Sequence, residues 1–173
     1  IPILYVTHSQ DETSRLADHL MLIEDGKIIG NGPINEMLTR FDLPLSHSGD
    51  AISIFDARVM SRDTDFNLMH LEFKGGQFIV PDNKLPIESL VRIRVAARDV
   101  SITKKKQTDT SILNIFPAVV EEMVPEGDAQ VMVRLTLKGV VLLACLTRKS
   151  ASSLKLDQGL SVFIQVKSVA ILS

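Results

Sequence analysis

The chain from Ser53 onward consists of short apolar runs separated by turn-forming or charged residues. Short runs rich in Val, Ile, Leu and Phe are typical of β-strands, and they leave little room for long helices. The predicted strands are Ser53–Met60, Phe66–Phe73, Gln77–Val80, Val91–Ala96, Val100–Thr103, Ile112–Val124, Ala129–Leu137, Val140–Leu146, Val162–Val166 and Val169–Leu172. Most of the chain is therefore restricted to a mainly β fold.

These strands form two series that loosely repeat each other. Phe55-Asp56-Ala57 parallels Phe116-Pro117-Ala118, and the Lys-Gly pair at 74–75 parallels the pair at 138–139, each marking a hairpin turn. Two copies of five short strands predict a pair of small OB-like barrels, here placed at residues 51–106 and 107–173. The polar stretch Thr147–Leu154 suits a short helix in the second series. Independent hairpins can also produce such a loose repeat by chance.

The first forty residues have a different pattern, in which strands and helices alternate. Ser9 and Glu12 form a capping box, which predicts a helix that begins there and ends near Asp18. The other predicted elements are a buried parallel strand at Ile3–Val6, strands at Leu20–Glu24 and Lys27–Gly30 around the Asp25-Gly26 turn, and a helix from Ile34 to about Arg40. We assign residues 1–42 to an α/β segment and the polar stretch 43–50 to a linker.

Composition excludes several classes of protein. A net charge of −2 gives no support for nucleic acid as a partner. The single cysteine, Cys145, has no internal partner for a disulfide, which fits a reducing compartment. The apolar runs are far shorter than the roughly 20 residues that cross a bilayer, so direct insertion into a membrane is not expected. The chain opens in the middle of an apolar strand without an initiator Met, and we interpret it as a fragment of a longer protein.

The first forty residues also carry a family resemblance. The segments that carry it are Val6-Thr7-His8-Ser9-Gln10-Asp11-Glu12, Leu16-Ala17-Asp18, Ile23-Glu24-Asp25-Gly26-Lys27-Ile28 and Gly30-Asn31-Gly32-Pro33. This series resembles the end of the P-loop ATPase domain of ABC transporters. In that family the histidine after this strand is the switch histidine, so the resemblance implies that His8 contacts the γ-phosphate of ATP. A side chain at the carboxyl end of a parallel strand faces the crevice where phosphates bind.

Other parts of an ATPase site are missing from this sequence. It contains no G-x-x-x-x-G-K-[ST] phosphate loop, no Leu-Ser-Gly-Gly-Gln signature and no acidic strand end for magnesium. We therefore expect ATP and Mg²⁺ to be cofactors of the full-length protein only, and the fragment alone to be inactive.

The second β series resembles the Mop module of the TOBE type, the molybdate-binding unit of molbindins, molybdate-responsive regulators and molybdate-import ATPases. The entry motif of the module matches Thr110-Ser111-Ile112-Leu113-Asn114. Its Thr-x-x-Ser pair matches Thr147 and Ser150, and its closing Lys-Ser pair matches Lys167-Ser168. In relatives these positions contact the oxyanion, usually between two modules. The resemblance implies a site for molybdate or tungstate built from Ser111, Asn114, Thr147, Ser150, Lys167 and Ser168. Many binding relatives have Arg where this chain has Leu113, so positive charge is lost from the site.

Together, the two resemblances cover nearly the whole chain. They imply the C-terminal part of the ATP-binding subunit of a bacterial molybdate importer, at the cytoplasmic face of the inner membrane. A homodimer, a membrane permease as partner and lobes that dimerise and sense molybdate are the further expectations, with no metal-ion site and no nucleic acid. Two alternatives stay open: a molybdate storage or sensor protein, and the ATPase subunit of another importer of sugars or oxyanions with a similar regulatory domain.

Overall fold

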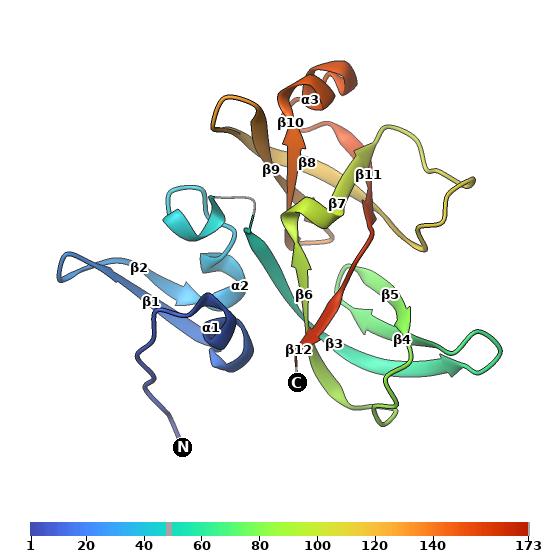
Figure 1. Cartoon of the computed structure of the whole chain (residues 1–173), viewed down its shortest axis with the longest axis horizontal. Coiled ribbons are helices and arrows are strands. Elements are labelled where there is room, and N and C mark those ends of the chain that lie inside the picture. Colours follow the sequence, from blue (N-terminus) through green and yellow to red (C-terminus); the bar gives the residue numbers. More distant parts are fainter. Residues whose placement is uncertain (48–49, 173) are drawn as a thin grey trace.

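The computed structural model describes residues 1–47 and 50–172 (Figure 1). An N-terminal segment, residues 1–47, lies beside two β-sheets that together make up the rest of the molecule. Its elements are helix α1 (Gln10–Leu16), strands β1 (His19–Glu24) and β2 (Lys27–Pro33), helix α2 (Ile34–Met37) and the short 3₁₀ helix η1 (Pro44–Ser46).

The N-terminal segment largely follows the sequence pattern. β1 and β2 form a hairpin around Asp25 and Gly26, whose φ angles of 47° and 74° fit the primed turns that hairpins favour. Both helices are shorter than expected. Ala17 has extended backbone angles, and α2 ends at Met37, although Leu38 still has helical angles. The predicted strand Ile3–Val6 is not a strand here. Its side chains are exposed, since no strand of the described residues lies beside it.

Two five-stranded antiparallel sheets follow. The first has the order β12-β6-β3-β4-β5, with β3 (Ile52–Asp63), β4 (Leu68–Phe73), β5 (Gly76–Pro81), β6 (Leu90–Ala96) and β12 (Ala170–Leu172). The second has the order β10-β9-β8-β11-β7, with β7 (Val100–Thr103), β8 (Asn114–Glu126), β9 (Gln130–Leu137), β10 (Val140–Thr147) and β11 (Ser161–Val166). Helix α3 (Arg148–Leu154) follows β10, and the 3₁₀ helix η2 (Ala97–Asp99) links β6 to β7.

Each sheet contains a strand from the other half of the sequence. β7 precedes the connector at residues 104–113, yet it pairs with β11 in the second sheet, where Ile102 faces Ile164. The last strand, β12, returns to the first sheet and pairs with β6, where Ile171 faces Ile93. The long β11–β12 stretch that crosses between the sheets is visible in red in Figure 1. This exchange joins the two lobes, by which we mean the two sheets with their connections.

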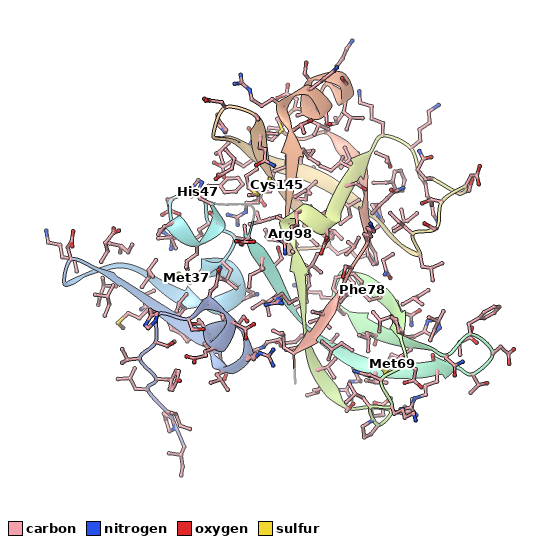
Figure 2. The ribbon with its side chains drawn as sticks, in the orientation of Figure 1. Met37, His47, Met69, Phe78, Arg98 and Cys145 are labelled. Atoms are coloured by element: carbon pink, nitrogen blue, oxygen red, sulfur yellow. The ribbon has the colours of Figure 1, made fainter. Side chains whose placement is uncertain are left out.

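A single hydrophobic core spans both lobes. Phe73 and Phe78 of the first sheet stack at a centroid distance of 4.6 Å, and Phe116 of the second sheet meets Phe78 edge-on at 5.0 Å. Figure 2 marks Phe78 and Met69, both of which are completely buried. The same cluster continues through Leu135, Leu142 and their neighbours on the second sheet.

The prediction of a mainly β, OB-like architecture behind a short α/β segment is confirmed. The Lys-Gly hairpin turns lie where they were expected, between β4 and β5 and between β9 and β10. The divisions at 42, 50 and 106 stay predictions, and two residues of the predicted linker, Ser48 and Gly49, lie outside the described residues.

Candidate functional sites

His8 lies at the end of the exposed N-terminal stretch, two residues before α1 begins. The following residue, Ser9, has extended backbone angles, and its hydroxyl accepts a hydrogen bond from the Glu12 N–H at 3.3 Å. This is the first half of the predicted capping box. The exposed imidazole of His8 is therefore held next to a capped helix start, so the backbone on its C-terminal side is fixed.

The second half of the capping box is different from the prediction. The Glu12 carboxylate accepts hydrogen bonds from the Thr7 hydroxyl at 2.5 Å and the Tyr5 hydroxyl at 3.2 Å. Its negative charge raises the pKa of the Tyr5 hydroxyl, and the hydrogen bond acts in the same direction. Glu12 thus links α1 to Tyr5 and Thr7, which both precede His8, whereas in a capping box its carboxylate would bond to the Ser9 N–H.

Asn114, a predicted oxyanion ligand, connects the two lobes. Its side-chain oxygen accepts from the Ile79 N–H at 2.7 Å, and its side-chain nitrogen donates to the Ile79 carbonyl at 3.0 Å. The residue is 8% exposed and begins β8, whereas Ile79 is in the middle of β5. The side-chain amide thus pairs with the Ile79 backbone as a neighbouring strand would, and it links the two sheets. A role as oxyanion ligand stays a prediction.

Thr147 and Ser150 are brought together at the start of α3. Thr147 is the N-cap, and its hydroxyl accepts from the Ser150 N–H at 3.1 Å and lies 2.8 Å from the Ser150 hydroxyl. Only one of the two hydroxyl protons is used between them. The other can be donated to a ligand, and both residues are exposed.

The remaining predicted ligands gather at the opposite end of β8. Val166 pairs with Asn114, the first residue of β8, so Lys167 and Ser168 follow near that end of the strand, and Ser111 lies three residues before it. By contrast, Thr147 pairs with Gln130, which pairs with Glu126 at the far end of the same thirteen-residue strand. Within one chain the two groups of donors are separated by the length of β8. Leu113, which is 59% exposed, lies with the first group.

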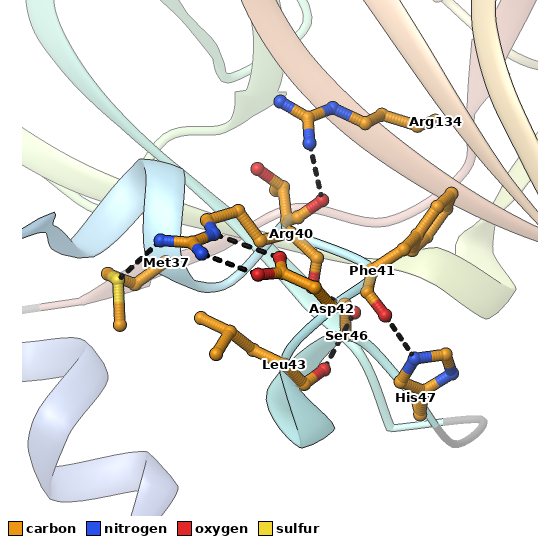
Figure 3. A network of polar contacts seen from close by, with 9 residues as sticks. Met37, Arg40, Phe41, Asp42, Leu43, Ser46, His47 and Arg134 are labelled. Carbon is orange, nitrogen blue, oxygen red and sulfur yellow. Dashed lines mark hydrogen bonds and ion pairs between the residues drawn. The ribbon is translucent and has the colours of Figure 1, made fainter. Parts of the chain in front are cut away.

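A polar network that the sequence did not predict surrounds the joint between the N-terminal segment and the lobes (Figure 3). Arg40 forms a two-pronged contact with Asp42, and the hydrogen bonds from Arg40 lower the pKa of that carboxyl group. Arg134 of β9 donates to the Thr39 carbonyl at 3.2 Å. Its Nε lies 3.3 Å from Glu121 but is not aligned for a hydrogen bond, so that contact is electrostatic only.

His47 closes this network on the side of the second sheet. One ring nitrogen lies 2.8 Å from the Phe41 carbonyl and the other 3.1 Å from the Glu126 carboxylate. With an acceptor at each nitrogen, the protonated ring is favoured, and the Phe41 carbonyl followed by Glu126 raises the pKa of His47. Such contacts between distant residues carry no short sequence motif, so only the folded chain reveals them.

Comparison with known proteins agrees with both halves of the structure. Residues 110–172 match the model of the TOBE domain. The "Molybdenum import ATP-binding protein ModC" of Albidiferax ferrireducens is 47% identical over 99% of this chain and 47% of its own length. The proteins with the same description from Aromatoleum aromaticum and Methylococcus capsulatus are each 43% identical over 99% of this chain, with 46% and 49% of their lengths covered.

The chain spans about half the length of these curated relatives. Among solved structures, the cytoplasmic molybdate-binding protein ModG with molybdate bound is similar with a TM-score of 0.60. The match covers 69% of this chain and 94% of that one at 20% identity, which shows a shared fold. The predicted resemblance to the C-terminal part of a molybdate-import ATP-binding subunit is confirmed. No helix among the described residues is long and apolar enough to cross a membrane.

Proposed function

We propose that this chain is the C-terminal part of the ATP-binding subunit of a molybdate or tungstate importer, which works at the cytoplasmic face of the inner membrane beside a permease. The observation that carries this proposal is the similarity to molybdenum import ATP-binding proteins along 99% of the chain, which includes the segment around His8. A storage or sensor protein built from the β lobes alone leaves that N-terminal segment without a role.

In this proposal His8 contacts the γ-phosphate of ATP during hydrolysis. An exposed imidazole can donate a hydrogen bond to a phosphate oxygen or orient the attacking water. The exposure of His8 and the fixed helix start after it support this role. The chain contains none of the glycine-rich backbone that holds a triphosphate and Mg²⁺, so the remaining contacts belong to the full-length protein.

The ATPase role is tested in the full-length transporter by His8→Ala. We expect ATP-driven molybdate uptake to be abolished, because the contact to the transferred phosphate is lost. The matched control is His70→Ala, which removes an imidazole from β4, far from α1 in the sequence and bonded to Gln77. Uptake at the wild-type rate by His8→Ala would rule out the switch role.

The oxyanion site is, in this proposal, composed of two copies of the chain. Molybdate and tungstate are tetrahedral dianions, which are bound by converging hydroxyl, amide and N–H donors. One chain presents Thr147 with Ser150 at one end of β8 and Ser111, Lys167 and Ser168 at the other. When two modules pack against each other, the Thr147 end of β8 in one copy meets the Lys167 end of β8 in the other. The homodimer thus completes the donor set.

Titration calorimetry of the purified chain with molybdate, tungstate, sulfate and phosphate tests this site. We expect molybdate and tungstate to bind, and Ser150→Ala or Lys167→Ala to weaken binding about tenfold, as expected for one charge-assisted hydrogen bond. Ser153→Ala on the exposed face of α3 is the matched control. Equal competition by sulfate, or no heat with any anion, would contradict an oxyanion-sensing role.

A further inference from the structure

The contacts of the first sheet with α1 have no role in the function derived so far. We propose that Arg92 and Arg94 of β6 are positioning residues, which hold α1 and through it set the position of His8. This inference rests on the proposed role of His8. It adds a route by which the lobes act on the ATP site.

Arg92 binds the C-terminal end of α1. Its Nη1 donates to the Ala17 carbonyl at 2.7 Å and to the Arg15 carbonyl at 3.4 Å, and its Nη2 lies 2.8 Å from the Asp18 carboxylate. Carbonyl groups at a helix end have no partner within the helix, and a cation there also matches the helix dipole. The Arg92 side chain is only 17% exposed, so these contacts are partly shielded from solvent.

Arg94 binds the other end of the same helix. Its Nη1 lies 3.0 Å from one carboxylate oxygen of Asp11, and the second oxygen of Asp11 lies 3.1 Å from Arg15. Asp11 is in the first turn of α1, three residues after His8. Because residues two apart on a strand point to the same face, β6 presents both guanidinium groups to α1 together.

Little else holds α1. Of its seven residues only Ser14 is buried, so the helix has no apolar face in the core. The nearby apolar contacts come from Ile34 of α2 and the following Leu38, which pack on Ile52 and Ile54 of β3. From α1 only its half-buried C-cap, Ala17, joins this cluster. A groove of about 730 Å³, with Asp18, Arg92 and Arg134 among its lining residues, separates the N-terminal segment from the sheets between these contacts.

The two arginines therefore transmit the position of β6 to α1. β6 is paired on one side with β3 and on the other with β12, the strand that comes from the second half of the chain. A movement of the two lobes as one unit that shifts β6 also shifts both ends of α1, and Ser9 and Glu12 carry that movement to the residues next to His8.

The experiment uses the full-length transporter and measures ATP hydrolysis. Arg94→Gln and Asp11→Asn each remove one side of the same ion pair, and we expect either to lower kcat about fivefold while the KM for ATP stays within twofold. Asp11→Asn also removes the Arg15 contact, so it should be the slower single variant, and the double variant should be no slower than it, because Arg94 then has no Asp11 carboxylate left to lose. Arg58→Gln, which breaks the Arg58–Glu88 pair within the same lobe, is the matched control and should keep the wild-type kcat.

The outcomes separate this inference from the proposed function. If His8→Ala abolishes hydrolysis while Arg94→Gln and Asp11→Asn behave as wild type, the positioning role is wrong and the ATPase role stands. If His8→Ala leaves hydrolysis unchanged, the proposed function of His8 fails first. Additive losses in the double variant, or an equal loss in Arg58→Gln, would also overturn the positioning role, because the effect would then not come from this ion pair.

Discussion

The two interfaces inside this molecule differ in kind. The two lobes share one hydrophobic core and exchange strands β7 and β12, so neither sheet is complete without the other half of the sequence. The N-terminal segment instead meets the lobes through ion pairs, side-chain contacts to carbonyl groups and two small apolar clusters, one at α2 and one where Phe41 packs near Met132. One continuous apolar core holds the first interface, whereas the second combines small apolar clusters with partly hydrated polar contacts.

This difference predicts that the pair of lobes is rigid and that the N-terminal segment can move against it. A packed core has few alternative arrangements, so the two lobes are expected to move and unfold as one unit. Polar interfaces of limited area resemble transient contacts, so the N-terminal segment is expected to change position at lower cost. In the proposed function, where the lobes act on the segment that contains His8, the movable contact lies on the path of that effect.

The largest effect is expected from a substitution in the core that the two lobes share. Phe78→Ala removes a completely buried ring that contacts Phe73 and Phe116, and we expect a loss of about 3–5 kcal/mol in unfolding free energy. Urea denaturation should show one transition for both lobes at a lower midpoint. Phe66→Ala, at a ring that is 75% exposed, should change the midpoint little. Two separate transitions would contradict the shared core.

The second prediction concerns the polar contact between the lobes. Asn114→Ala leaves the Ile79 N–H and carbonyl without their side-chain partners, which we expect to cost about 1–3 kcal/mol in unfolding free energy. Ser111→Ala, three residues earlier on the exposed approach to β8, should be close to neutral. A stable Asn114→Ala protein with weaker molybdate binding would instead assign Asn114 to the ligand.

The third prediction affects only the N-terminal segment. Arg92→Gln removes charged donors from the Ala17 carbonyl and from Asp18, and we expect about 1 kcal/mol less protection of α1 against local opening. Hydrogen exchange should become faster in α1 and unchanged in the sheets. Faster exchange throughout β3 would show instead that Arg92 stabilises the lobe itself.

The smallest expected effect depends on pH. The folded state raises the pKa of His47, so its stabilising contribution is complete below the unfolded pKa of about 6.5 and is lost as pH rises through the folded value. Because the side chain is 40% exposed, we expect a difference below about 1 kcal/mol. Thermal melts at pH 6 and pH 8 should differ less in His47→Gln than in the wild type, and an unchanged difference would exclude His47 as its source.

The sequence predicted the strands well because their signal is local. Apolar runs bounded by Lys-Gly or Asp-Gly turns are detectable within a few residues, and the hairpins at 25–26, 74–75 and 138–139 lie at those turns. The isolated strand Ile3–Val6 was not realised, because an apolar run forms a strand only where a neighbouring strand accepts its hydrogen bonds.

The candidate sites were predictable only as residue types. Thr147 and Ser150 lie together in the structure because a helix N-cap and the residue three positions later are neighbours, and their role as oxyanion ligands stays a prediction. The sequence did not show that the Asn114 amide bonds to the Ile79 backbone, or that Arg92 and Arg94 bind α1. In each case the partners are 35 or more residues apart.

By itself, the sequence determined the β character of the chain, its turns, the capped helix after His8 and its family resemblance, because each depends on residues that are close along the chain. The tertiary structure alone decided the exchange of β7 and β12, the shared core and the separation of the predicted oxyanion donors to opposite ends of β8. Strand order and register bring together residues that are far apart in the sequence, and burial of apolar surface across both sheets selects that arrangement.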